Sequence, residues 1–87
     1  MDDLLGSLSA DILQWVEDLL SQQDLPDTDL KALFIRYGLT EAQVSRALSY
    51  RRLYLLNVFR EGYTPIRKGD QALRFDPRTL NFVPLKR

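Results

Sequence analysis

The chain of 87 residues contains no cysteine and no histidine. Without cysteine it has no disulfide framework and no thiolate metal site, so the fold must depend on packing. Cysteine and histidine are also among the commonest catalytic groups near neutral pH. The four glycines are scattered at expected turns instead of forming a phosphate-binding loop. These absences predict a protein that is not an enzyme and that needs no metal or other cofactor.

Long apolar runs are also missing, since none approaches the ~20 residues that a membrane span requires. The first three residues, Met1-Asp2-Asp3, are acidic overall, whereas a secretory signal peptide begins with basic residues. We therefore expect a cytoplasmic protein that does not contact a membrane. The length supports a single domain covering residues 1–87.

Basic residues are absent from the first 30 positions, although the formal net charge of the whole chain is zero. This first stretch carries a charge of −8 and the remainder carries +8. Such asymmetry is typical of a protein with a surface for a polyanion. Alternatively, the two parts pack together and neutralise each other without any ligand. The eight acids of the first stretch are Asp2, Asp3, Asp11, Glu17, Asp18, Asp24, Asp27 and Asp29.

Apolar residues at three- and four-residue spacing predict two helices in the first half of the chain. The first covers residues 9–22 and is followed by Pro26, which cannot continue a helix. The second covers residues 27–37. Gly38 ends it, because glycine tolerates the left-handed conformation that follows many helices. The apolar stripe of the first helix consists of Leu8, Ile12, Trp15, Val16, Leu19 and Leu20.

A third helix is predicted over residues 40–60. It begins with a capping box, in which the Thr40 hydroxyl accepts from the backbone N–H of Gln43 and the Gln43 side chain reaches back. Arg51 interrupts the apolar side of this helix. Either its aliphatic stem is buried while its charge reaches water, or the helix bends near residues 49–50.

The pattern changes to alternation near the C-terminus, which predicts a β-hairpin within residues 63–87. The alternating stretches are residues 71–76 and 80–85, and residues 76–79 between them have turn chemistry. Pro84 restricts the second strand to a sheet edge. The predicted fold is therefore mainly α, with a three-helix helix-turn-helix core and a C-terminal hairpin. This hairpin is either a wing that contacts DNA or a cover for the helical core.

Residues 30–49 match the pattern of a helix-turn-helix, two short helices that cross steeply at a tight turn. The ninth place of the pattern requires glycine, and Gly38 occupies it. The fifth place usually holds a small residue so that the helices can approach, but here it holds Phe34. The apolar places are occupied by Leu33, Tyr37, Leu39, Val44 and Ala47.

The outward side of the expected third helix carries small or hydrogen-bonding residues that fit the ~12 Å major groove of DNA. Arg46 is expected to pair with guanine, Gln43 with adenine and Glu41 with a cytosine amino group. Basic residues elsewhere are expected at phosphates, which position a protein without reading the base sequence. The candidate groove residues are Thr40, Glu41, Gln43, Ser45, Arg46 and Ser49. The candidate backbone contacts are Lys31, Arg36, Arg51, Arg52, Arg67, Lys68, Arg74 and Arg78.

The segment Tyr37-Gly-Leu-Thr-Glu-Ala-Gln-Val-Ser-Arg-Ala-Leu48 resembles the G-L-T-x-x-x-V-S-x-A turn of plasmid KorA/TrfB-type repressors. It resembles the PapB-type fimbrial regulators more loosely. By layout the resemblance extends to residues 10–60, and the hairpin has no counterpart in it. It implies a plasmid or phage transcriptional regulator, a repressor that binds double-stranded DNA as a homodimer. It also implies that Thr40, Glu41, Gln43, Ser45 and Arg46 lie at the groove.

Two other functions fit the same sequence. Exposed leucines at positions 53 and 56 predict a contact with another protomer or another protein. The chain could thus be a small phage or plasmid inhibitor or adaptor that binds a protein partner, or a virion structural subunit. An inhibitor would use the acidic side of the first helix, namely Asp11, Glu17, Asp18 and Asp24. Glu17 and Asp18 are adjacent on the first helix, and we expect them to form a solvated face and not a catalytic acid/base pair.

Overall fold

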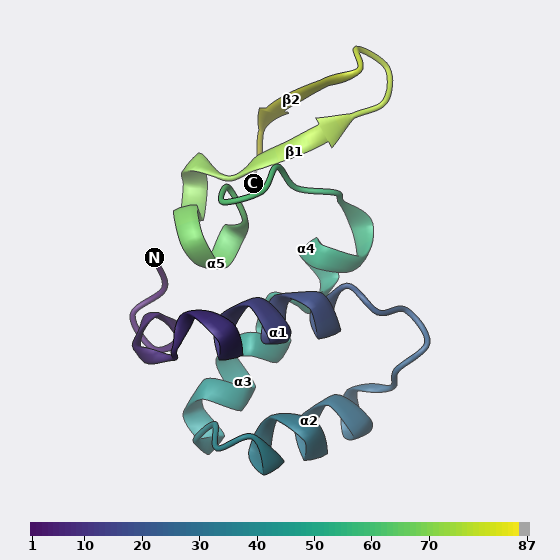
Figure 1. The fold of residues 1–87 in the computed structure, drawn as a ribbon. Coiled ribbons are helices and arrows are strands. Elements are labelled where there is room, and N and C mark those ends of the chain that lie inside the picture. Colours follow the sequence, from purple (N-terminus) through teal and green to yellow (C-terminus); the bar gives the residue numbers. More distant parts are fainter. Residues whose placement is uncertain (86–87) are drawn as a thin grey trace.

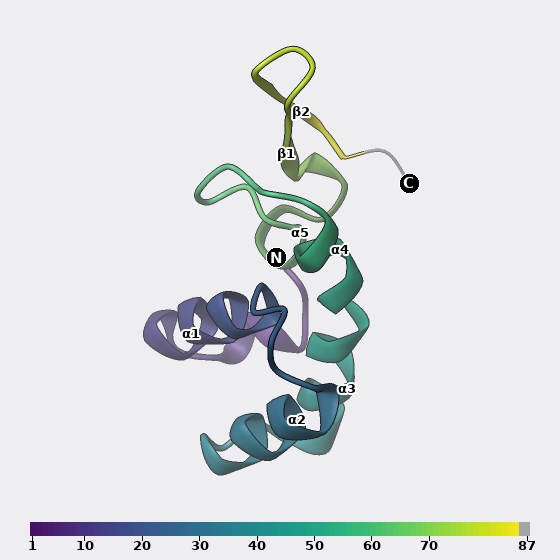
Figure 2. The ribbon, with the colours of Figure 1, turned by 90° about the vertical axis from the view of Figure 1, so that its right-hand side faces the viewer.

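The computed structural model describes residues 1–85, in which a group of helices precedes a two-stranded antiparallel hairpin (Figure 1). This arrangement confirms the predicted mainly α fold with a C-terminal hairpin. The last two residues of the predicted C-terminal element, Lys86 and Arg87, lie outside the described residues. The molecule measures 40 × 27 × 22 Å, and it is elongated because the hairpin stands away from the helices (Figure 2).

Three helices form the first part of the fold: α1 (Ala10–Leu20), α2 (Asp27–Arg36) and α3 (Glu41–Ser49). The Ser9 side chain caps α1 by accepting a hydrogen bond from the backbone N–H of Ile12. The bounds of α1 and α2 lie within one or two residues of the predicted ones. None of the helices in residues 1–85 is long and apolar enough to cross a membrane.

The turn between α2 and α3 follows the chemistry that the sequence predicted. Gly38 adopts a φ of +95°, which glycine reaches without steric cost, and α2 ends immediately before this turn. The backbone N–H of Gln43 donates to the Thr40 hydroxyl at 3.1 Å, and the Thr40 N–H donates to Gln43 Oε1 at 2.9 Å. This capping box starts α3 two residues after the glycine, and α3 rises steeply away from α2 (Figure 2).

Phe34 lies at the centre of the helical core and is completely buried. The Trp15 ring meets it edge-on, with centroids 5.9 Å apart, and the Tyr37 ring lies 4.0 Å from that of Trp15. The large Phe34 ring therefore fills the space that a small residue would leave between α1 and α2. The core consists of Leu5, Leu13, Val16, Leu20, Leu30, Phe34, Leu39, Val44, Ala47, Tyr54 and Ile66.

The residues before α1 fold back onto α3, a contact that no sequence pattern predicted. Asp2 Oδ1 accepts hydrogen bonds from the N–H groups of Leu4 and Leu5 at 3.0 and 3.1 Å. These bonds start the short 3-10 turn η1 (Leu5–Ser7), and Leu5 is completely buried in the core. The N-terminal segment is consequently part of the folded unit.

The predicted helix over residues 40–60 is not continuous, because it is interrupted at Tyr50. A separate helix, α4 (Arg51–Leu56), follows the interruption. The Tyr50 hydroxyl donates to Asp2, whereas the neighbouring Arg51 is buried and reaches the loop between α1 and α2. Tyr50 and Arg51 are thus held by different segments of the chain. The break lies at the position where the sequence pattern indicated a bend.

The helical region also ends earlier than predicted, at Leu56. Asn57 is extended, with φ −136° and ψ 152°, and its side chain donates to the carbonyl of Leu53 at 3.0 Å. The next residues pair with the hairpin, because the Phe75 N–H donates to the Val58 carbonyl at 2.7 Å. Backbone pairing with the first hairpin strand therefore competes with continuation of the helix.

A short helix that was not predicted, α5 (Pro65–Lys68), precedes the hairpin and is followed by the 3-10 turn η2 (Gly69–Gln71). Thr64 at the N-cap, followed by proline at the first helical position, is a helix-start signal that could have revealed it. Gly69 ends the helix with a φ of +56°.

The hairpin consists of β1 (Leu73–Asp76) and β2 (Asn81–Pro84). Asp76 starts the connecting turn, because its carboxylate accepts from the Arg78 N–H at 2.9 Å. Residues 58–60 bond to the other side of β1, so β2 is the outer strand. The edge position predicted from Pro84 is therefore confirmed.

One face of this small sheet is apolar and turned to solvent. The register places Val58, Phe75 and Phe82 in one row across neighbouring strands. Val58 and Phe82 are exposed, as is Leu80 in the turn. Within residues 1–85, no residue of β1 or β2 belongs to the buried helical core, although Leu73, Phe75 and Val83 are half-buried.

Candidate nucleic-acid interface

The outward face of α3 is the surface that the helix-turn-helix hypothesis assigns to a DNA groove. Glu41, Ala42, Ser45 and Ser49 are exposed on α3, and three of these four side chains are small. The Ser49 hydroxyl donates to the Arg46 carbonyl at 2.6 Å, one turn back along the helix. Small side chains would let the α3 backbone approach the base edges closely.

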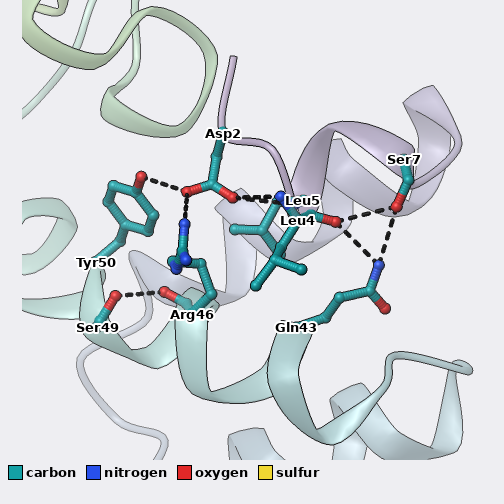
Figure 3. Close-up of polar contacts among 8 residues, drawn as sticks. All are labelled: Asp2, Leu4, Leu5, Ser7, Gln43, Arg46, Ser49 and Tyr50. Carbon is teal, nitrogen blue, oxygen red and sulfur yellow. Dashed lines mark hydrogen bonds and ion pairs between the residues drawn. The ribbon is translucent and has the colours of Figure 1, made fainter.

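Gln43 and Thr40 were predicted at this face, but their polar groups have partners within the protein. The Gln43 Nε2 donates to the Leu4 carbonyl at 3.1 Å and to the Ser7 hydroxyl at 3.2 Å (Figure 3). The remaining oxygen of Gln43 completes the capping box with Thr40. Gln43 is half-buried, so the structure does not present it as an open reader of adenine.

Arg46, the predicted guanine reader, forms an ion pair with Asp2 at 2.9 Å (Figure 3). The Arg46 side chain is 44% exposed, whereas that of Asp2 is only 2% exposed. The same oxygen, Asp2 Oδ2, also accepts a hydrogen bond from the Tyr50 hydroxyl at 2.7 Å. The N-terminal segment therefore flanks one side of the outward α3 face and holds its arginine.

Asp2 is ionised despite its burial. Burial opposes the charge, but hydrogen bonds from Tyr50, from the Leu5 N–H and from Arg46 outweigh it and lower the pKa of the Asp2 carboxyl. The same hydrogen bond and ion pair raise the pKa of the Arg46 guanidinium. This contact is a fixed structural feature at neutral pH, because both partners are charged there.

The residues predicted at phosphates differ in their surroundings. Lys31 and Arg36 on α2 and Arg52 on α4 are exposed. Arg51 is not, because its guanidinium donates to the Gln22 carbonyl at 2.7 Å and also bonds to the Leu25 carbonyl and to Asp27. The prediction that Arg51 contacts phosphate is therefore wrong, since its donors hold the loop between α1 and α2.

Arg67 and Lys68 were predicted to contact DNA from the hairpin region, but both lie on α5. Arg67 is 24% exposed and its Nε donates to the buried Glu17 at 2.7 Å, so it contributes to the fold. Lys68 is exposed, and its ammonium lies 5.5 Å from the centre of the Tyr63 ring. The guanidinium of Arg60 approaches the same ring at 5.1 Å. Of the two predicted residues, Lys68 alone is exposed for a ligand.

Glu17 contradicts the prediction of a solvated face, because it is only 4% exposed. Its carboxylate accepts from the Tyr54 hydroxyl at 2.6 Å and from Arg67. Burial and this hydrogen bond raise the pKa of Tyr54 well above its usual value. The sequence contained an indication that Glu17 is buried, because Glu17 shares one helical face with Leu13 and Leu20.

Three ion pairs join the acidic first part of the chain to the basic remainder: Asp2 with Arg46, Glu17 with Arg67, and Asp27 with Arg51. In each pair one partner is less than one-tenth exposed. Packing of the two parts against each other therefore explains a share of the charge asymmetry. Lys31, Arg36, Arg52, Arg60 and Lys68 remain exposed cations.

No family model matches the chain, and comparisons with curated proteins and with solved structures also give no match. The resemblance to KorA/TrfB-type and PapB-type regulators thus remains a prediction. Within residues 1–85, no three acidic, cysteine or histidine side chains are grouped to hold a metal ion.

Proposed function

We propose that the chain is a sequence-specific DNA-binding transcriptional regulator, a repressor that places α3 in the major groove. The observation that supports this proposal is the outward face of α3, where Ala42, Ser45 and Ser49 leave the helix accessible directly after its capped start. The steep rise of α3 from α2 is the arrangement that such a groove-reading helix needs. We also propose that the protein acts on DNA in the microbial cytoplasm and binds paired half-sites as a homodimer.

The structure changes which residues we propose as readers. Ser45 and Ser49 are placed to hydrogen-bond base edges, and Glu41 to accept from a cytosine amino group. Arg46 keeps one guanidinium nitrogen on Asp2 and offers the remaining donors to a phosphate. Arg52, exposed on the following helix α4, contacts a second phosphate.

Fluorescence anisotropy of a labelled random-sequence duplex, measured at several salt concentrations, tests this proposal. If about four to six phosphates are contacted, log affinity falls with log salt with a slope of about −4 to −5. Replacing Arg46 and Arg52 by alanine should reduce the magnitude of the slope by about 2, since two phosphate contacts are lost. Arg60→Ala is the matched control, because this exposed arginine lies on the hairpin side of the molecule.

Absence of binding even at low salt would contradict the proposal, because non-specific electrostatic affinity is strongest there. If Arg60→Ala reduced the salt slope by the same amount, the duplex would bind at a surface other than α3. If the duplex binds as proposed, selection of bound sequences identifies the operator, and ultracentrifugation of the complex gives the number of protomers.

A further inference from the structure

A groove beside α1 and α4 has no occupant in the fold. It lies between α1 and residues 55–64, which pass from α4 to α5 above that helix (Figure 1). Its upper part is a hollow of about 580 Å³. The hollow is lined by Asp18 and Ser21 of α1 on one bank and by Val58 and Glu61 on the other.

A second hollow of about 570 Å³ continues the first along α4. Both hollows are lined by Gln23, Leu55 and Leu56, so they meet at these residues. The lower hollow ends at Leu25 and Pro26 in the loop between α1 and α2. The combined groove is elongated, a shape that suits a segment of chain better than a compact small molecule.

The lining of the groove includes exposed apolar side chains that a partner would cover. Leu56 and Val58 are each 68% exposed, and Leu55 and Phe59 beside them are half-buried. Neighbouring apolar side chains left in water mark binding surfaces more often than isolated ones do. Leu56 lines both hollows, which makes it the central contact of the groove.

The upper part of the groove is also acidic. Asp18 and Glu61 are exposed on opposite banks, and Glu17 lies beneath them. The cation that lines this part, Arg67, is already bonded to Glu17 and, at 3.3 Å, to Gln14. The exposed charge of both banks is therefore negative, so a polyanion such as DNA or an anionic membrane is repelled.

We propose that this groove binds an amphipathic, basic segment of a partner protein. An apolar side chain of the partner packs on Leu56 and Val58, and flanking lysine or arginine residues reach Asp18 and Glu61. Apolar contact supplies affinity, while the paired carboxylates select a basic partner over an acidic one. The upper part of the groove, where the paired carboxylates lie, contains no residue of α3, so the chain can hold this segment while a duplex lies on α3.

The test uses the full chain and a fluorescein-labelled synthetic helix of leucines and lysines in an amphipathic pattern. A matched helix with glutamate in place of lysine, and a scrambled leucine–lysine peptide, are the reference probes. We expect saturable binding of the amphipathic lysine helix and at least about tenfold weaker binding of both references. Equal binding of the acidic or scrambled peptide would overturn the proposal.

Variants then locate the contact. Leu56→Ser should weaken binding about tenfold, because the central apolar contact is lost. The control, Leu80→Ser, alters a 74% exposed leucine in the hairpin turn and should leave the affinity unchanged. Asp18→Asn combined with Glu61→Gln should weaken binding and flatten its salt dependence.

Insensitivity to Leu56→Ser would overturn the proposal, as would an affinity that falls equally with Leu80→Ser. Self-association of the chain that Leu56→Ser abolishes would identify a second copy as the occupant instead. Duplex affinity measured on the Leu56→Ser variant should equal that of the unaltered chain. Failure of groove binding and failure of DNA binding are therefore observed separately.

Discussion

Arg51 lies on the buried side of α4 and stabilises a loop that is distant from α4 in the sequence. It is 7% exposed and donates to the backbone carbonyls of Gln22 and Leu25 as well as to Asp27. These carbonyls belong to the loop between α1 and α2, so one guanidinium replaces the water that would otherwise satisfy them. The planar fork suits this task because it presents several donors at fixed angles.

Arg51→Met keeps much of the aliphatic stem but removes these donors. We expect the free energy of unfolding to fall by about 1–3 kcal/mol, because partly buried acceptors lose their donor. Urea denaturation followed by circular dichroism measures the change. Arg52→Met, at the exposed neighbouring position, is the control and should alter stability by less than about 0.5 kcal/mol. Equal losses in the two variants would contradict this role of Arg51.

Tyr54 is expected to keep its proton in the folded chain at alkaline pH. Burial and the Glu17 carboxylate raise the pKa of its phenol, so the unfolded state releases the proton more readily than the folded state. Stability should therefore begin to fall as the pH rises above about 10, the usual pKa of tyrosine. Ultraviolet titration should detect one phenolate fewer in the native chain than in the urea-unfolded chain. Tyr54→Phe should remove that difference, and a persistent difference would contradict the assignment to Tyr54.

At the scale of elements, the capping box at the start of α3 contributes measurably to the stability of the fold. Thr40→Ala leaves the Gln43 N–H without its side-chain acceptor, and we expect the free energy of unfolding to fall by about 1 kcal/mol. Thr79→Ala, at an exposed position of the hairpin turn, is the matched control and should be nearly neutral. Thermal unfolding of both variants compares them. A neutral Thr40→Ala would mean that tertiary packing alone positions this helix.

The elements with strong local signals could be predicted, and those held by distant contacts could not. Gly38 and the Thr40 capping box fix the turn before α3 through neighbouring residues, so the sequence is enough there. The end of α4 at Leu56 depends on pairing of Val58 with Phe75, which are far apart in the chain. No local pattern contains that information.

The same distinction applies to the candidate site. Helical periodicity identified the outward positions of α3, including Ser45 and Ser49. It could not reveal that Gln43 and Arg46 meet the N-terminal segment, because those contacts join residues more than 35 positions apart. Glu17 was assigned to solvent on residue type alone, since its partners Tyr54 and Arg67 come from later elements.

At the scale of the whole molecule, the ion pairs between the acidic and basic parts should be more sensitive to acid than to salt. One member of each pair is buried and thus weakly screened. The pKa of Asp2 is lowered in the fold, so its contribution is present above its unfolded value of about 4 and is lost as the pH falls through the folded value.

Urea denaturation at neutral pH, at low and high sodium chloride, and again near pH 3 measures this difference. We expect the acidic condition to reduce stability more than salt does. Asp2→Asn should lower stability at neutral pH and flatten its decline toward acid. A larger effect of salt than of acid would indicate that exposed charges dominate.

The pairing of Glu17 with Arg67 also has a consequence for how the chain is made. The two residues are 50 positions apart, and synthesis at about 5–20 residues per second separates their appearance by roughly 2.5–10 s. During that interval α1 leaves the ribosome with a carboxylate on its buried side and no arginine to meet it. Before α5 emerges, only the Tyr54 hydroxyl can meet this acid, so we expect a nascent chain halted before α5 to close less stably and to be more open to chaperones and proteases.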